Sequence, residues 1–386
     1  MEQVDDWRSQ RRRILEKAKR IIVKVGSAVL TTDRGLDERV VNRLADQIAA
    51  LHDRGLEIVL VTSGAVAAGR YVLGPGSGTG CMVHKQAASA VGQSRLMHSY
   101  DEAFGRYGKI TAQVLLTKDD LRSRERFLNA RNTMCRLLDW RVIPVVNEND
   151  TVAVQELKLK FGDNDVLSAM VANLVGADVI INLTSAEGVY DDNPLENPGA
   201  NFVPCIENIA EINLQSMCRG KTGAGTGGML SKLMAARRAS RIGVPTLIVS
   251  GRQNFVLERV FNLEELGTWI APTQKMLSGR KFWLAYHLDP VGTIIVDEGA
   301  ARALTVKGKS LLAAGIIEVE GNFGMGALVR IVSSGGETLG VGLCNFKASE
   351  LRRIRGLTSV EIEGVLGPCP HQEVVHRDNL VLDNAL

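Results

Sequence analysis

Short runs of β-branched residues alternate with longer helix-like segments from residue 20 to about residue 270. The runs cover residues 20–26, 57–64, 109–116, 141–147, 178–185 and 245–251. Each is apolar nearly throughout, which is typical of strands in a parallel sheet that helices cover on both faces. The pattern predicts an α/β fold, an αβα sandwich with a mainly parallel central sheet. Because such a sheet binds ligands at the carboxyl ends of its strands, chemistry is expected among the polar residues there.

Helical periodicity fills the segments between these runs. In the first segment apolar side chains recur at steps of three or four residues before the stop signal Gly55, at Leu36, Val40, Leu44, Ile48 and Leu51. Helices are also predicted at 82–107, 119–139, 165–176 and 229–242. After residue 270 a linker-like stretch leads into short alternating runs broken by glycines, which predict a small, mostly β domain. We therefore expect an N-terminal extension (1–19), a first domain (20–271), a linker (272–283) and a second domain (284–377).

The composition limits the classes of function. With 386 residues, 45% of them hydrophobic, the chain can build more than one packed core. Its net charge of +3 is too small to predict nucleic-acid binding by itself. No run approaches the roughly 20 apolar residues of a membrane span, and no apolar stretch follows the basic run at 11–13 as in a signal peptide. The six cysteines are scattered without a CxxC pair, which favours a cytoplasmic protein without a cysteine metal site.

Two clusters of carboxylates and amides stand out within NENDTVAVQELKLKFGDNDVLSAM, residues 147–170. The first, NEND at 147–150, follows an apolar run, and the second, DND at 163–165, opens a predicted helix. By itself the second cluster is compatible with a helix N-cap and turn, or with a divalent-metal site. The amides of the first cluster, with Asp150, suit a substrate that carries both an ammonium group and carboxylates.

Two further strand ends carry polar residues next to glycines. Lys24 lies inside the apolar run IIVKVGS, where an ammonium group is costly unless it meets an anion or reaches water at a sheet edge. Gly26, at the end of this run, would let a ligand approach the backbone closely. Ser63 stands in VTSGAVAAG between a strand and a helix start. That position suits both capping of the helix and binding of a carboxylate or phosphate.

A glycine-rich segment precedes a predicted helix in KTGAGTGGMLSKLMAARRAS, residues 221–240. Its glycines match GxGxxG only formally, because a dinucleotide fingerprint should follow a strand in the first βαβ unit. No Walker A sequence occurs in the chain. The alternatives are a plain surface loop or a nucleotide-phosphate clamp that delivers Lys232. In the second case Lys24 and Lys232 would neutralise phosphoryl charge, and Asp165 between them would fix their positions.

The motifs of the chain resemble those of the glutamate 5-kinase family, amino acid kinases that carry a C-terminal PUA domain. The likeness runs in order through VKVGSAVL, VTSGAVAAGR, KQAASAVGQSRLM, RERFLNARNT, IPVVNENDTVA, FGDNDVLSAMVA and GTGGMLSK. In the last third, TIIVDEGAARAL and GNFGMGALVRI look like a PUA domain. The resemblance implies an amino acid kinase-like αβα sandwich followed by a small, mostly β PUA-like domain. Residues 1–19 exceed the usual start of the family and have no assigned role.

Residue roles follow from this resemblance. Lys24 and Lys232 would stabilise the phosphoryl group during transfer, and Asp165 would orient them. Glutamate would be held by Ser63, Asp150 and Asn164. ATP would be held by Lys24, Thr184, Ser185, Thr226, Gly227, Gly228, Met229, Leu230, Ser231 and Lys232. The family usually has an acidic residue after this threonine, so Ser185 departs from the pattern at the adenosine contacts.

The implied reaction is attack of the glutamate 5-carboxylate on the γ-phosphate of ATP, the first step of proline biosynthesis. A carboxylate is already an anion at neutral pH, so no general base is required, and Mg²⁺ would arrive mainly on the nucleotide. The resemblance also implies feedback inhibition by proline and a homo-oligomer, either a dimer or a tetramer. It further implies functional coupling to glutamate-5-semialdehyde dehydrogenase, which would use the acyl phosphate.

Two other readings stay open at the level of the sequence. The first is another kinase of the superfamily, acting on acetylglutamate, aspartate, UMP or carbamate. The clusters at 147–150 and 163–165 and the PUA-like domain argue against it. The second is an RNA-binding protein, because PUA domains commonly bind structured RNA and KASELRRIRG, residues 347–356, is basic. A solvated helix face explains this basic segment as well.

Overall fold

We describe the fold from a computed structural model of the chain. The structure describes residues 6–74, 82–153, 163–194, 196–214, 228–273, 281, 284, 289–367 and 372–382. The chain divides into two compact units, Met1–Met276 and Leu277–Leu386, and each is described by itself. Most of the predicted linker at 272–283 and the glycine-rich stretch before Gly228 lie outside the described residues.

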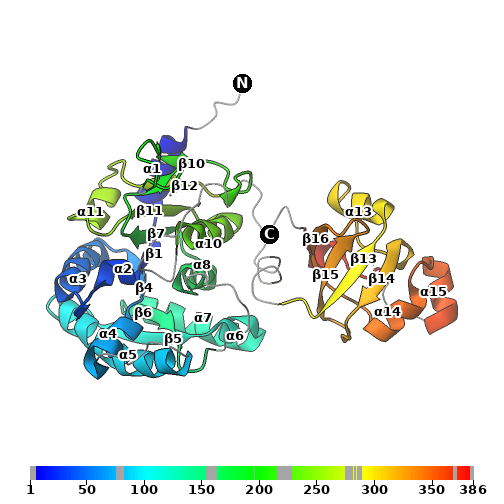
Figure 1. Cartoon of the computed structure of the whole chain (residues 1–386), viewed down its shortest axis with the longest axis horizontal. Coiled ribbons are helices and arrows are strands. Elements are labelled where there is room, and N and C mark those ends of the chain that lie inside the picture. The colour runs from blue at the N-terminus through cyan, green and yellow to red at the C-terminus, as the bar shows by residue number, and fades with distance from the viewer. Residues whose placement is uncertain are drawn as a thin grey trace. The chain divides into compact units, whose positions relative to one another are not determined.

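A mainly parallel sheet organises the first unit (Figure 1). Its described strands lie in the order β10 (Cys205–Ile206), β12 (Thr268–Ile270), β11 (Thr246–Ser250), β7 (Val179–Thr184), β1 (Arg20–Val25), β4 (Glu57–Val61), β6 (Ile143–Glu148) and β5 (Thr111–Leu116). From β11 to β5 neighbouring strands are parallel, whereas β12 pairs with β11 in the antiparallel direction. The predicted sheet is therefore confirmed. The short strands β10 and β12 were not predicted, because runs of two or three residues are too short to show a periodic pattern.

Helices cover both faces of this sheet (Figure 1). On one face, α3 (Glu38–Asp53) and α11 (Val256–Phe261) pack against β1 and β7. On the other face lie α8 (Asp163–Val175), α7 (Arg124–Asp139) and α10 (Met229–Arg241). The helix predicted at 119–139 is two helices, α6 (Lys118–Arg122) and α7. The break falls at Ser123, whose hydroxyl accepts from the backbone N–H of Arg126 and so begins a new helix.

The alternation of side chains along β1 decides where Lys24 points. Ile21, Val23 and Val25 belong to the core under α3, whereas Ile22 belongs to the core under α8. Because successive side chains of a strand point to opposite faces, Lys24 emerges on the α8 side with Ile22. The predicted alternative of a lysine at the sheet edge is wrong, since β1 lies between β7 and β4.

Two helices that follow β4 cross with their backbones in contact. They are α4 (Ala65–Leu73) and α5 (Met82–Gly105), and they meet at Gly69 and Gly92. A Cβ atom on Gly92 would lie 1.8 Å from the carbonyl oxygen of Ala65, and one on Gly69 would lie 1.7 Å from that of Ala88. Glycine is therefore required at both positions, because any side chain would force the helices apart. The crossing sets the position of Ser89 and Gln93, which lie on α5 beside Gly92.

A helix that the sequence analysis did not predict opens the chain. This helix, α1 (Trp7–Lys17), buries Leu15 in the core shared with α3 and α11. The buried guanidinium of Arg11 donates to the backbone carbonyl of Glu264, and Arg8 forms an exposed ion pair with Glu265. Part of the predicted N-terminal extension is thus packed into the core of the first unit.

Smaller elements complete the first unit. They are α2 (Ser27–Leu30) and two short antiparallel pairs, β2 (Thr31–Thr32) with β3 (Gly35–Leu36) and β8 (Val189–Tyr190) with β9 (Phe202–Val203). None of the described helices is long and apolar enough to cross a membrane.

The second unit has its own sheet and its own core. The described strands lie in the order β14 (Ile316–Glu320), β13 (Gly292–Val296), β15 (Leu328–Ser333), β16 (Thr338–Leu343) and β17 (Leu380–Leu382). Its helices are α13 (Glu298–Thr305), α14 (Ala348–Ile354) and α15 (Ser359–Leu366). The apolar side chains of these elements form one cluster that is separate from the clusters of the first unit. A small, mostly β domain was predicted in this part of the chain, and the prediction is confirmed.

Candidate functional site

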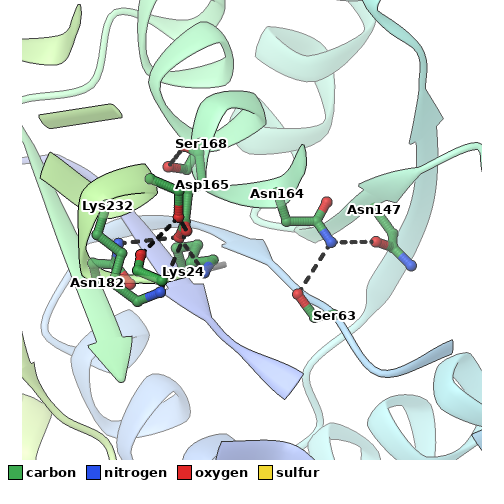
Figure 2. Close-up of polar contacts among 10 residues, drawn as sticks. Lys24, Ser63, Asn147, Asn164, Asp165, Ser168, Asn182 and Lys232 are labelled. Carbon is green, nitrogen blue, oxygen red and sulfur yellow. Dashed lines mark hydrogen bonds and ion pairs between the residues drawn. The ribbon is translucent and has the colours of Figure 1, made fainter. Parts of the chain in front are cut away.

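Two lysines and one aspartate meet at the carboxyl ends of the central strands (Figure 2). Lys24 comes from β1, Asp165 from the first turn of α8, and Lys232 from the first turn of α10. The Lys24 ammonium donates to Oδ1 of Asp165, and the Lys232 ammonium lies 3.3 Å from Oδ2 of the same carboxylate. All three side chains are buried, with exposures of 3%, 1% and 7% for Lys24, Asp165 and Lys232. The structure therefore brings together the three residues that the sequence analysis assigned to phosphoryl transfer.

The charges of this cluster do not cancel. Burial alone would raise the pKa of Asp165, but the charges of the Lys24 and Lys232 ammonium groups and the hydrogen bonds from Lys24 and Ser231 hold that pKa below its usual value. The pKa of Lys24 is lowered, first by burial and then by the neighbouring charge of Lys232, and Asp165 opposes this shift. An ionised Asp165 between two ammonium groups leaves one net positive charge at a buried site, which suits a multiply charged anion.

Two neutral side chains complete the shell around Asp165. The hydroxyl of Ser231 donates to Oδ2 at 2.6 Å, and the amide of Asn182 donates to Oδ1 at 3.4 Å. Each carboxylate oxygen thus accepts from one lysine and one neutral donor. Ser231 was predicted as a nucleotide contact, whereas Asn182 was not predicted, although an amide inside the apolar run VIINLT was a visible signal.

A chain of amides lies beside the lysine cluster, on the other side of the α8 start. Asn164 precedes Asp165, but its side chain points toward Ser63 and Asn147 (Figure 2). Its Nδ2 donates to the Ser63 hydroxyl at 3.1 Å and to Oδ1 of Asn147 at 3.0 Å. The Nδ2 of Asn147 in turn donates to Oε1 of Gln93 at 2.8 Å. The two polar clusters at 147–150 and 163–165 therefore meet in space, through Asn164 and Asn147.

Ser63 and Asp150 belong to this second half of the site. The N-cap of α4 is Gly64, which has a φ of +104°, and no described side chain caps that helix. The alternative that Ser63 is only an N-cap is therefore wrong. Asp150 follows β6, and its Oδ2 accepts from the Ser89 hydroxyl at 2.6 Å. Ser89 and Gln93 of α5 are the contacts that the sequence analysis missed, because their approach depends on the crossing of α4 and α5.

Two buried polar atoms of the amide chain have no hydrogen-bond partner among the described residues. They are Nε2 of Gln93, a donor, and Oδ1 of Asn164, an acceptor. An unpaired buried polar atom is costly, so such atoms in a native structure call for an explanation such as a bound ligand. An unpaired donor and an unpaired acceptor along one chain of amides suit a zwitterion, which presents a carboxylate and an ammonium group.

Helix starts add positive potential to the same region. The N-cap residues of α4 and α10 are Gly64 and Gly228, and neither helix start carries a side-chain cap from the described residues. The first backbone N–H groups of these helices therefore have no capping side chain as acceptor, and the helix dipole favours an anion at these N-termini. This geometry, with Lys232 in the first turn of α10, suits phosphate groups.

The remaining predicted nucleotide residues are spread along this edge of the sheet. Thr184 ends β7 and is buried, and Ser185 follows it at the exposed surface. Gly228, Met229, Leu230 and Ser231 form the start of α10. Thr226 and Gly227 lie outside the described residues. No group of three His, Cys, Asp or Glu side chains placed to hold a metal ion occurs in the described part of the chain.

The fold and the lysine–aspartate cluster define a class of protein, and comparison with known families identifies the same class. Residues 19–250 match the amino acid kinase family, and residues 292–366 match the PUA domain. The first unit is thus an amino acid kinase domain, and the second unit contains a PUA domain.

Similar proteins narrow this class. A glutamate 5-kinase of Maridesulfovibrio salexigens is 58% identical over 378 residues, which cover 98% of this chain and 100% of that protein. A glutamate 5-kinase of Nitratidesulfovibrio vulgaris is 57% identical, with 98% and 99% of the two chains covered. One from Geobacter sulfurreducens is 47% identical, with 96% and 99% covered. The chain belongs to the glutamate 5-kinase family. The other kinases of the superfamily, weighed as alternatives above, are not favoured.

Proposed function

We propose that this chain transfers the γ-phosphate of ATP to the 5-carboxylate of L-glutamate, giving L-glutamyl 5-phosphate and ADP. This reaction is the first step of proline biosynthesis. Its main support is the buried pair of ammonium groups that share the carboxylate of Asp165, because a phosphoryl group in transfer carries negative charge that needs such compensation. The near full-length similarity to glutamate 5-kinases supports the choice of acceptor.

The chain's own residues would act by placement and charge. The Lys24 and Lys232 ammonium groups would contact the oxygens of the transferred phosphoryl group, and the charge that develops between donor and acceptor would be stabilised by both. Asp165 would keep the ammonium groups apart and oriented. MgATP is the substrate, and its metal ion offsets phosphate charge when the nucleotide binds. The attacking group is a carboxylate, so no proton has to be removed before attack.

Glutamate would lie over the amide chain. The Ser63 hydroxyl and the unpaired Nε2 donor of Gln93 would meet its carboxylate, and Asp150 and the unpaired Oδ1 acceptor of Asn164 would meet its ammonium group. Ser89 supports this assignment because its hydroxyl fixes one oxygen of Asp150 and leaves the carboxylate oriented for a cation. The nucleotide would extend from Lys24 and Lys232 along the start of α10 to Thr184 and Ser185. Thr226 and Gly227 would belong to the same nucleotide loop.

A coupled assay of ADP release tests this function. Glutamate should stimulate ADP release from MgATP, whereas acetylglutamate, aspartate, UMP and carbamate should not. Hydroxylamine should trap the acyl phosphate as a hydroxamate, which identifies the carboxylate as the acceptor. If one of the other compounds stimulates ADP release and glutamate does not, the assignment is wrong.

Further properties are proposed from family membership. Proline should inhibit, since it shares the ammonium and carboxylate groups of glutamate. The assay with and without proline measures this. We also propose a cytoplasmic homo-oligomer, a dimer or tetramer, which sedimentation can test. The acyl phosphate would pass to glutamate-5-semialdehyde dehydrogenase, and a coupled assay with that enzyme would detect this transfer.

RNA binding by the second unit is the less supported proposal. Two arginines of the basic segment at 347–356 already donate to backbone carbonyls, Arg352 to Val319 at 3.2 Å and Arg353 to Val365 at 3.1 Å. These contacts support the reading of that segment as a structural helix face. A gel shift of the full chain with structured RNA, repeated at rising salt, separates the two readings.

A further inference from the structure

An amide lies buried in the middle of the apolar strand β7. Every residue of β7 is buried, and Asn182 is 1% exposed. A buried polar side chain is retained at a cost unless its donors and acceptors are used. We therefore look for the role of Asn182 in the lysine–aspartate cluster, which its amide contacts through Asp165.

The sheet register places Asn182 next to Lys24. The two residues are partners on the parallel strands β7 and β1. Ile22 and Ile180, two positions earlier on each strand, lie in the core under α8, so Lys24 and Asn182 share that face. Asp165, in the first turn of α8, lies over both side chains (Figure 2).

The orientation of the Asn182 amide is fixed by its partner. The carboxylate of Asp165 only accepts hydrogen bonds, so the group that faces it must be the Nδ2 donor, at 3.4 Å from Oδ1. The other end of the amide, Oδ1, is then directed away from the carboxylate. This oxygen is buried and has no hydrogen-bond donor within the described parts of the chain. An unpaired acceptor is thus buried on the residue that pairs with Lys24 across the sheet.

We propose that Asn182 is a positioning residue of the phosphoryl-transfer site, which holds Asp165 with its Nδ2 and accepts from the Lys24 ammonium with its Oδ1 during transfer. This inference rests on the proposed function, because it concerns the lysine that contacts the transferred group. The phosphoryl group itself is not touched by Asn182.

The reason lies in the geometry of an ammonium group. Lys24 has three N–H donors on a flexible stem, and one donor is given to Asp165. A second donor to Asn182 leaves the third aimed at a single place, where the phosphoryl oxygen would arrive. With only one fixed contact the ammonium group could rotate and shift, and small displacements of a catalytic group are expensive in rate. Asn182 would therefore act through Lys24, on kcat more than on the binding of glutamate.

Two substitutions at Asn182 test this proposal. Asn182→Leu keeps the size and removes both polar groups, and it should lower kcat about tenfold or more while the KM for glutamate changes less than about twofold. Asn182→Asp adds a carboxylate beside Lys24. Among the described residues, the charged groups that already act on Lys24 are Asp165 and Lys232. The alkaline limb of kcat/KM should move to lower pH in Asn182→Leu, which removes an acceptor from Lys24, and to higher pH in Asn182→Asp.

A matched control lies in the neighbouring strand β11. The Thr246 hydroxyl is also buried and, like Oδ1 of Asn182, has no partner within the described residues, and Thr246 pairs with Ile180 rather than with Asn182. Thr246→Val should leave kcat and the alkaline limb unchanged. A merely structural role for Asn182 would lower the melting temperature and leave the pH profile in place.

The outcomes separate this inference from the proposed function. If Asn182→Leu retains kcat within about threefold and both variants keep the wild-type alkaline limb, Asn182 is not a positioning residue. Shifts of the limb in the same direction in both variants would also overturn the proposal. If Asn182→Leu does not fold, the limb of Asn182→Asp decides. If wild type does not use glutamate, the proposed function fails, and the same comparison is made with the acceptor that the substrate panel identifies.

Discussion

At the residue scale, the site is a balance of charge around Asp165. Two ammonium groups face one carboxylate, so this cluster carries one net positive charge before any nucleotide binds. Phosphoryl transfer needs little covalent chemistry from the protein, and placement with charge compensation is the main contribution. Each substitution in this cluster should therefore affect the rate of transfer more than the binding of glutamate, which belongs to the neighbouring amide chain.

Lys232→Ala tests the first half of this division. Removal of the ammonium group should lower kcat by about two to three orders of magnitude and leave the KM for glutamate within about twofold. Steady-state ADP release at saturating MgATP measures both constants. Lys307→Ala, at an exposed position of the second unit, is the control and should behave as wild type. A defect that falls mainly on the KM for glutamate would contradict the role given to Lys232.

Asp150→Ala tests the second half. Loss of the carboxylate that meets the substrate ammonium group should raise the KM for glutamate about 10- to 100-fold, with a smaller effect on kcat. Ser89→Ala removes only the hydroxyl that orients Asp150, so it should raise the same KM by less. The two variants are compared in the same glutamate titration. An unchanged KM in Asp150→Ala would place Asp150 outside the substrate pocket.

Asp165→Asn links this balance to stability. The variant leaves two buried ammonium groups without an anion, so the free energy of unfolding at pH 7 should fall by about 3 kcal/mol. The pKa of Asp165 is held below its model-compound value of 3.8, so its contribution is present above that pH and is lost as the pH falls through the lower folded pKa. Urea unfolding should give a constant difference between wild type and variant from neutral pH down to about pH 4.5, which shrinks on further acidification. A difference that grows in acid would contradict the ionised state of Asp165.

At the element scale, the crossing of α4 and α5 positions the contacts to Asp150 and Asn147. Gly92→Ala would place a Cβ atom 1.8 Å from a backbone oxygen, so it should lower the free energy of unfolding by about 3 kcal/mol and raise the KM for glutamate. Gly105→Ala, at the end of the same helix, is the control, because a Cβ there would meet no described atom within 4 Å. Chemical denaturation measures both variants. Equal stability of the two would show that the helices can separate without cost.

The same scale shows what the sequence could and could not predict. The apolar runs predicted the central strands well, because a run that is apolar nearly throughout is typical of a strand buried on both faces of a parallel sheet. Lys24, Asp165 and Lys232 stood out as charged residues at strand and helix ends. Gln93 and Ser89 did not, because their approach to the site depends on a backbone contact between two helices. Asn182 was visible as an amide inside an apolar run. Its place beside Lys24 depends on the register between β7 and β1, which no local sequence pattern gives.

At the scale of the whole molecule, the two units have separate apolar cores, and every described residue of the site belongs to the first unit. A chain that ends at residue 276 should therefore fold and release ADP in response to glutamate with a kcat within about threefold of the full chain. Circular dichroism checks folding, and the coupled assay checks activity. An inactive but folded fragment would show that the second unit contributes to catalysis.

The origin of the charged cluster in three distant segments has a consequence for the life of the protein. Asp165 lies 141 residues after Lys24, and Lys232 lies a further 67 residues along the chain. A nascent polypeptide that has left the ribosome only as far as α8 carries no complete set of charges. Lys232 on α10 completes this set. The three residues of the charged cluster can therefore come together only after α10 (Met229–Arg241) has been synthesised.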